Sequence, residues 1–235
     1  MLPWLTATPG PARSASGQTE LERIRELVVR AHYEAAERAA ERYLTRRGLP
    51  AAERNQGLEM LAFVQVARRD PGAEATLSEI YRRDPGHTLS DVDASPVIAA
   101  AFARARENAP PPLRVALDHA PPRKSPSGFT LPVEVEIREG ADAVDAVVVA
   151  YRIGEAPTPT HLVLPVGRDH VARGHLAVPG GPPERVRYHI EARAPSGAVL
   201  QAIGSLDDPY ELRVWRRAAA GGTHGQGPVR AYGSQ

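Results

Sequence analysis

Histidine side chains are the first residues of this sequence that could do chemistry, by binding a metal ion. The chain has eight histidines. His170 and His175 are five residues apart, which places them on opposite faces of a regular strand, and His161 has no neighbouring carboxylate. A zinc site needs about four ligands that converge on one point. The spacing therefore indicates exposed strand and loop histidines, and we expect no metal site.

Two aspartate pairs are the corresponding candidates for calcium. They are Asp91 with Asp93, and Asp207 with Asp208 before Pro209. A dedicated calcium site supplies about six to eight oxygen ligands, and neither pair comes close to that number. Aspartate is also a common turn residue. We therefore interpret both pairs as turns.

Signatures of covalent or phosphate chemistry are missing from the sequence. No serine lies in a Gly-x-Ser-x-Gly turn, and no phosphate-binding loop follows a predicted strand. The glycine pair at 180–181 is flanked by prolines rather than by a helix. The chain has no cysteine, which excludes disulfides, thiolate zinc sites and iron–sulfur clusters. We predict a protein that is not an enzyme, with no cofactor and no small-molecule substrate.

The charge pattern bears on the class of partner. The chain carries 29 Lys and Arg against 28 Asp and Glu, a net charge of +1, and both signs are interspersed. No stretch is visibly set up to attract nucleic acid or an anionic membrane. No apolar run reaches the ~18 residues of a membrane span. We expect protein partners, with no nucleic acid and no membrane insertion.

The first half of the sequence has helical periodicity. Residues 18–108 predict about five helices, and the first is expected to begin with a capping box formed by Thr19 and Glu22. A third helix near residues 51–69 is apolar almost all round, so it should lie between its neighbours. Residues 1–17, which precede the first helix, are interpreted as either a disordered leader or the remnant of a signal peptide. Prolines at 110–112 predict a stiff linker over residues 109–112.

The second half alternates between apolar and polar residues with a period of two. Seven or eight short strands separated by turns predict an antiparallel β-sandwich over residues 113–217. Trp215 is expected to cover the end of the sandwich core. Residues 218–235 have no periodic apolar pattern and are predicted to be a disordered tail. The expected strands are 113–118, 131–137, 146–153, 161–166, 171–178, 185–192, 198–203 and 210–215.

Two segments of the helical half carry a resemblance. Residues 33–50 have a tyrosine, an alanine three positions later and a proline after the helix, and residues 75–85 repeat this about 40 residues later. These segments resemble the second half of a tetratricopeptide repeat (TPR). The Trp-Leu-Gly signature of the first repeat helix is missing, so a plain helical-hairpin bundle stays open.

One segment of the β half carries a second resemblance. Tyr188, Ile190 and Ala192, followed by Ser196 and Gly197, resemble the penultimate strand of fibronectin type III and immunoglobulin-like domains. The resemblance implies that these three side chains face inward and that the Tyr188 hydroxyl bonds to backbone across the sandwich. It also implies that Arg187, His189, Glu191 and Arg193 face outward.

A chain that combines TPR-like helices with one such sandwich domain is similar to envelope proteins of GC-rich Gram-negative bacteria. This resemblance implies a non-enzymatic adaptor or scaffold in a larger assembly for motility, secretion or surface functions, in the periplasm or at the cell envelope. The partner-binding residues expected on the concave face of the TPR-like helices are Arg23, Arg30, Asn55 and Glu59. The alternatives are a carbohydrate-binding module and a cytoplasmic regulatory adaptor.

Overall fold

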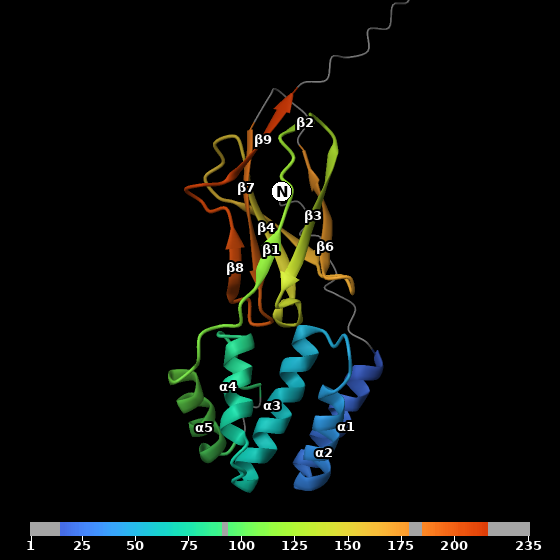
Figure 1. Ribbon diagram of the computed structural model, residues 1–235, viewed down its shortest axis with the longest axis vertical. Coiled ribbons are helices and arrows are strands. Elements are labelled where there is room, and N and C mark those ends of the chain that lie inside the picture. The colour runs from blue at the N-terminus through green and yellow to red at the C-terminus, as the bar shows by residue number, and fades with distance from the viewer. Residues whose placement is uncertain (1–14, 91–93, 179–184, 216–235) are drawn as a thin grey trace, which may run out of the picture.

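Five helices precede a region of two β-sheets, in the order that the change of period predicts. The computed structural model describes residues 15–90, 94–178 and 185–215, and Figure 1 shows the helices gathered below the sheets. Predictions on residues 1–14, on Asp91 and Asp93, on the glycines at 180–181 and on the tail lie outside these ranges. The helices are α1 (Ala15–Val29), α2 (Tyr33–Leu44), α3 (Ala51–Arg68), α4 (Ala73–Arg83) and α5 (Pro96–Glu107).

The start of α1 corrects one prediction. The helix begins at Ala15, so Thr19 lies inside it and does not cap it, and residues 15–17 belong to the helix rather than to a leader. Its end is marked by Ala31, whose φ of 54° is left-handed. There His32 N–H donates to Leu27 O at 2.9 Å and closes the helix.

Helix α3 is central to the helical half. It contacts α1, α2, α4 and α5, as its apolar sequence predicts. Two separate hydrophobic clusters flank it, one around Ile24 and Tyr43 and the other around Ile80 and Phe102. Within the first cluster the Tyr43 hydroxyl donates a 2.9 Å hydrogen bond to the buried Glu53 carboxylate. Burial and this bond both raise the pKa of Tyr43 above its ordinary value.

In the described part of the β half there are nine strands. One sheet has the order β1-β3-β6, and the other has the order β2-β9-β7-β4-β5, with β8 also paired to β7. The bounds are β1 (Ala116–Asp118), β2 (Lys124–Pro126), β3 (Thr130–Glu139), β4 (Ala146–Ile153), β5 (Thr160–Pro165), β6 (Val171–Ala177), β7 (Arg185–Arg193), β8 (Val199–Ile203) and β9 (Tyr210–Trp215). Eight of these match predicted strands, and β2 was not predicted. Every pairing is antiparallel except that of β2 with β9, which is parallel.

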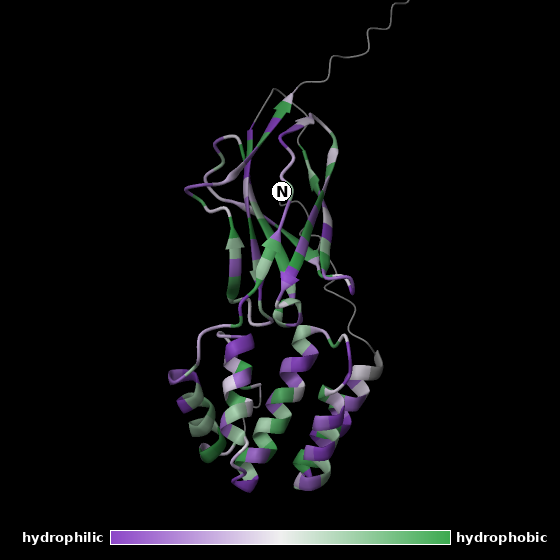
Figure 2. Ribbon diagram, in the orientation of Figure 1, coloured by the Kyte–Doolittle hydropathy of each residue, from purple (hydrophilic) through white to green (hydrophobic). Residues whose placement is uncertain are grey.

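The two sheets share one hydrophobic core. Val133 and Val135 of β3 face Val147 and Val149 of β4, with Ile190 of β7 beside them, and all five are buried. Figure 2 shows hydrophobic residues along the strands of both sheets. Burial of this apolar surface stabilises the pair of sheets, at roughly 1.5–3 kcal/mol for each fully buried large side chain.

Three predictions about the β half differ from the structure. Trp215 is 50% exposed, because the alternation of β9 turns Leu212 and Val214 inward and Trp215 to the outer face. Tyr188 is buried as expected, but its hydroxyl lies 2.9 Å from His119 Nε2 rather than bonding to backbone. His189, expected to face outward, is only 9% exposed, since it lies against Glu191 on the outer face.

The helical and β halves meet at the end of α4. Leu113 N–H donates to Arg82 O at 2.7 Å, and Arg83 Nη1 lies 2.8 Å from the Asp142 carboxylate. Ser196, in the turn after β7, donates from its backbone N–H to Asp84 Oδ2 at 3.0 Å and from its hydroxyl to Oδ1. No helix among the described residues is long and apolar enough to span a bilayer.

Candidate functional site

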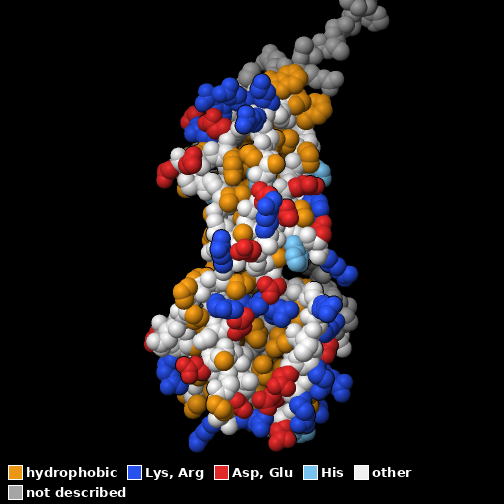
Figure 3. Space-filling model, viewed as in Figure 1, with side chains coloured by type: hydrophobic (Ala, Val, Ile, Leu, Met, Phe, Trp, Pro, Cys, Tyr) orange, Lys and Arg blue, Asp and Glu red, His pale blue; other side chains and the backbone are white. Residues whose placement is uncertain are grey.

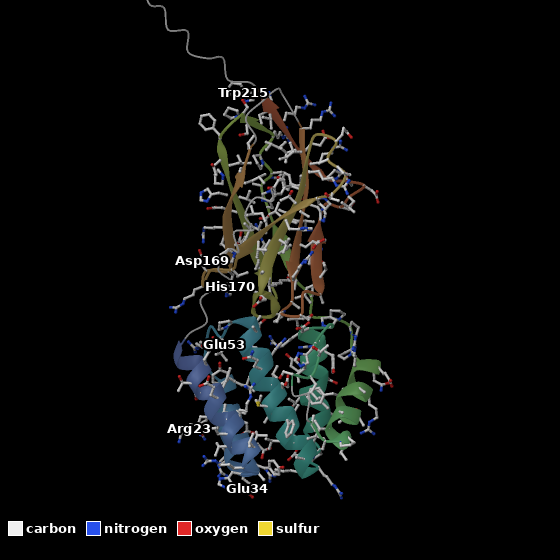
Figure 4. The ribbon with its side chains drawn as sticks, turned by 180° about the vertical axis from the view of Figure 1, so that it is seen from behind. Arg23, Glu34, Glu53, Asp169, His170 and Trp215 are labelled. Carbon is white, nitrogen blue, oxygen red and sulfur yellow. The ribbon has the colours of Figure 1, made fainter. Side chains whose placement is uncertain are left out.

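The four residues predicted to bind a partner do not share a surface. Arg23 is exposed on α1 and Arg30 is exposed in the turn that follows it, and Figure 4 shows Arg23 on the outside of the helical half. Asn55 and Glu59, on α3, are only 4% and 2% exposed. They are therefore not displayed to a partner in this structure. Partner binding by Arg23 and Arg30 stays a prediction.

Asn55 and Glu59 have internal partners instead. The Asn55 amide donates to Asp84 Oδ2 at 3.3 Å, the same carboxylate that accepts from Ser196. Glu59 accepts from the backbone N–H of Ser90 at 3.2 Å and from its hydroxyl. Both residues thereby hold the chain that follows α4, because a buried polar group is costly unless it is bonded.

The Glu59 carboxylate is kept ionised by its neighbours. Burial alone would raise its pKa, but hydrogen bonds and the charge of nearby groups outweigh burial and lower it below the ordinary value. His87 Nε2 lies 3.0 Å from Glu59 Oε2, although its angle is not that of a good hydrogen bond. The His87 and Ser90 side chains both approach the carboxylate, which ties the segment after α4 to α3.

A groove between α1 and α2 is the better candidate for binding. It has a volume of about 520 Å³, and no residue of α3 lines it. Ile24, Leu27 and Ala39 contribute apolar surface to it. Ile24 is 1% exposed and separates the groove from the hydrophobic cluster beneath it. The groove therefore has an apolar floor, and it opens on the side of the α1–α2 hairpin that α3 does not cover.

Arginines dominate the rim of this groove. Arg23, Arg38 and Arg42 line it, against Glu20 as the one carboxylate in the lining. Glu20 is itself 2.8 Å from Arg46, outside the groove, and Arg38 is 3.9 Å from Glu34. Among the described residues no ion pair is found for Arg23 or Arg42. The rim thus presents guanidinium groups with spare donors, which suit carboxylates.

A second groove lies between α3, α4 and α5, with a volume of about 550 Å³. Leu77 and Val97 contribute apolar surface, and Val97 is 69% exposed. Its charges are balanced, with Arg69 and Arg104 against Asp70 and Glu74. It therefore has no electrostatic preference of the kind that the α1–α2 groove shows.

Sequence reasoning identified Arg23 and missed its two companions on α2. Arg38 and Arg42 are four residues apart, so they lie on one helical face. That spacing is a signal, but nothing in the sequence shows that this face lies beside Arg23. The pairing of α1 with α2 brings the three together.

The β half contains a histidine–tyrosine pair, His119 with Tyr188. His119 Nδ1 lies 2.8 Å from the Glu134 carbonyl oxygen. Since a carbonyl only accepts, Nδ1 carries the hydrogen, and in the neutral ring Nε2 accepts from the Tyr188 hydroxyl. Burial, with a smaller contribution from Tyr210, raises the pKa of Tyr188. The two contacts of His119 tie the loop after β1 to β3 and β7.

Metal ligands are the last chemical candidates. His170 lies in a turn with a φ of 61° and His175 on β6. Ser205 Oγ accepts from the backbone N–H groups of Asp207 and Asp208, which form a turn. In the part of the chain that the structure describes, no three His, Asp or Glu side chains are grouped to hold a metal ion.

Comparison with known protein families finds no match to this chain. A search of functionally characterised proteins finds no match either.

Proposed function

We propose that this chain is a non-enzymatic adaptor whose helical half binds an acidic, partly apolar segment of a protein partner in the α1–α2 groove. The observation that carries the proposal is the arginine rim of Arg23, Arg38 and Arg42 above an apolar floor. A partner helix or extended segment with carboxylates beside apolar anchors would match both properties.

The arrangement of the helices supports a TPR-like adaptor. Alternate helices contact each other, α1 with α3 and α3 with α5, as well as their neighbours in sequence. In helical repeats each hairpin stacks on the next in this way. The face of the α1–α2 hairpin that α3 leaves uncovered is where a further helix could stack.

The topology of the sheets supports an immunoglobulin- or fibronectin-III-like β half. In such folds the first, second and fifth main strands form one sheet, and the third, sixth and last strands form the other. The orders β1-β3-β6 and β5-β4-β7 with β8 and β9 fit this scheme, if β2 is taken as an added edge strand. Such sandwiches serve many functions, so this likeness supports an architecture and not an activity.

Residence in the periplasm or at the cell envelope, in a motility, secretion or surface assembly, is part of the proposal and rests on resemblance. A fusion to a reporter that is active only outside the cytoplasm tests it, with the fusion expressed from the native start of the gene. Reporter activity confined to the cytoplasm would favour the alternative of a cytoplasmic adaptor.

The groove is tested by a charge-removal triple variant, Arg23→Gln, Arg38→Gln and Arg42→Gln. Partner capture by cross-linking and mass spectrometry should be lost in this variant, while its far-UV circular dichroism stays that of the wild type. The matched control is Arg25→Gln, Arg47→Gln and Arg106→Gln, three exposed arginines of the helical half outside the groove. Equal capture by the two triple variants would show that the groove is not the binding site.

A further inference from the structure

The strand register brings cations together on the outer face of the larger sheet. Lys124 of β2 lies opposite Arg213 of β9, and Arg213 lies opposite Arg185 of β7. In the next row Arg187 of β7 lies between Arg152 of β4 and Glu211 of β9. All five belong to alternate positions that face away from the core. We call these five residues the cationic face.

Neighbouring carboxylates do not neutralise this face. Glu211 is 3.9 Å from Arg185, and Glu155 is 2.7 Å from Arg187. Both contacts are solvent-exposed, and exposed ion pairs contribute little. The Nε atoms of Arg152 and Arg187 are buried and have no hydrogen-bond partner, so the neighbouring carboxylates leave these two guanidinium groups partly unsatisfied. Like charges directly opposite on a sheet are destabilising, so the free chain keeps a set of cations that an external anion would relieve.

An apolar tip adjoins the cationic face at the end of the sandwich away from the helices. Trp215 is 50% exposed and lies opposite Pro126. Phe129, three residues after Pro126, is 44% exposed. Figure 3 shows Lys and Arg side chains gathered at this end with hydrophobic side chains beside them, and Figure 4 shows Trp215 at the same extremity. We call Pro126, Phe129 and Trp215 the apolar tip.

We infer that this end of the molecule docks on the surface of an anionic phospholipid bilayer. Basic side chains are attracted to anionic headgroups, and exposed aromatic rings, tryptophan above all, favour the boundary between headgroups and acyl chains. The cationic face and the apolar tip adjoin one another, so one orientation satisfies both. A purely electrostatic partner such as a soluble polyphosphate would leave the exposed aromatic rings without a role.

This docking goes beyond the proposed adaptor function and stands independently of it. It uses the opposite end of the molecule from the α1–α2 groove (Figure 1), so both could be occupied together. Docking is at the surface, through side chains of strand ends and loops.

Vesicle co-sedimentation tests the inference on the full chain. Wild-type protein should sediment with vesicles of phosphatidylcholine mixed with phosphatidylglycerol and not with phosphatidylcholine alone, and added salt should release it. Replacing Lys124, Arg185 and Arg213 with Gln should weaken binding about a hundredfold, since each basic residue contributes roughly a fivefold gain near an anionic surface. The control variant Arg25→Gln, Arg47→Gln and Arg106→Gln has the same change in net charge and should bind as the wild type.

Tryptophan emission tests the apolar tip separately. The chain has two tryptophans, so Trp4→Phe leaves Trp215 as the only one. Its emission should shift to the blue on addition of anionic vesicles, and Trp215→Ala should weaken sedimentation several-fold while preserving the fold. Three results would each overturn the inference. The first is no binding to anionic vesicles, and the second is equal binding by the wild type and the cationic-face variant. The third is binding to soluble polyphosphate together with a Trp215 emission that does not shift when vesicles are added.

Discussion

Removal of the Asp84 carboxylate should uncouple the helical and β halves. Asp84 is 1% exposed. It accepts two hydrogen bonds from Ser196 across the junction and one each from Asn55 and Gly86 within the helical half. A hydrogen bond to a charged group contributes roughly 1.5–3 kcal/mol, and an orphaned buried donor adds a penalty. We therefore expect Asp84→Ala to lower the free energy of unfolding by about 3 kcal/mol.

A double-mutant cycle isolates the contact across the junction. Ser196→Ala removes the hydroxyl and keeps the backbone N–H, so it should cost about 1.5 kcal/mol in the wild type. In Asp84→Ala only the 3.2 Å bond that the hydroxyl accepts from Ala198 N–H is left to lose, so the cost there should fall to about 0.5 kcal/mol. Urea unfolding followed by circular dichroism reports the helices, and Trp215 emission in a Trp4→Phe background reports the sandwich. The two signals should coincide in the wild type and separate in Asp84→Ala.

Additive effects in the cycle would refute this reasoning, because the coupling would then be zero. Ser205→Ala is the matched control. Its hydroxyl serves a turn within the β half, so its effect should add to that of Asp84→Ala within about 0.5 kcal/mol.

Three further predictions concern single positions. Ala31→Gly should raise the free energy of unfolding by about 1 kcal/mol in urea titrations, since Ala31 has a φ of 54° and glycine adopts this conformation without strain; an unchanged midpoint would contradict it. The pKa of Glu59 is lowered in the folded state, so its contribution is present above the unfolded pKa near ~4.3 and is lost as pH falls through the folded value. Glu59→Gln should therefore flatten the acid side of the stability–pH curve, and a curve parallel to the wild type would disprove the assignment. A Cβ at Gly174 would lie 2.3 Å from Cδ2 of the buried Leu164. Gly174→Ala should therefore lower the melting temperature by several degrees, equivalent to about 1–3 kcal/mol of stability. The control is Gly128→Ala, which has open space around its Cβ but a left-handed φ, and it should lower the free energy of unfolding by about 1 kcal/mol or less.

Strand positions were largely predictable, because alternation in the sequence records which side chains face the core. The predicted strands 146–153 and 210–215 have the observed bounds. The strand β2 was missed because it has three residues, one of them proline, and pairs with β9, which lies far along the chain. A single sequence contains no signal for such a pairing.

The candidate sites were less predictable, because each depends on which elements become neighbours. Asn55 and Glu59 look like spare polar residues of a helix, and their partners Asp84 and Ser90 come from chain that follows α4. The cationic face depends on register: Lys124 and Arg213 become adjacent only when β2 and β9 pair. The expectation that no face would attract an anionic membrane came from the distribution of charges along the chain, and it stays a prediction that the vesicle experiment tests.

The parallel pairing of β2 with β9 has a mechanical consequence. The polypeptide enters the sandwich beside the helices and leaves it at the far end, where β9 terminates (Figure 1). A pull between the helical half and the end of β9 would draw these parallel strands past each other. Their hydrogen bonds, among them Arg213 N–H to Arg123 O at 3.1 Å, would then bear the load together in shear rather than break one after another. A chain held at both ends would thus resist extension more strongly than one whose last strand could be peeled away.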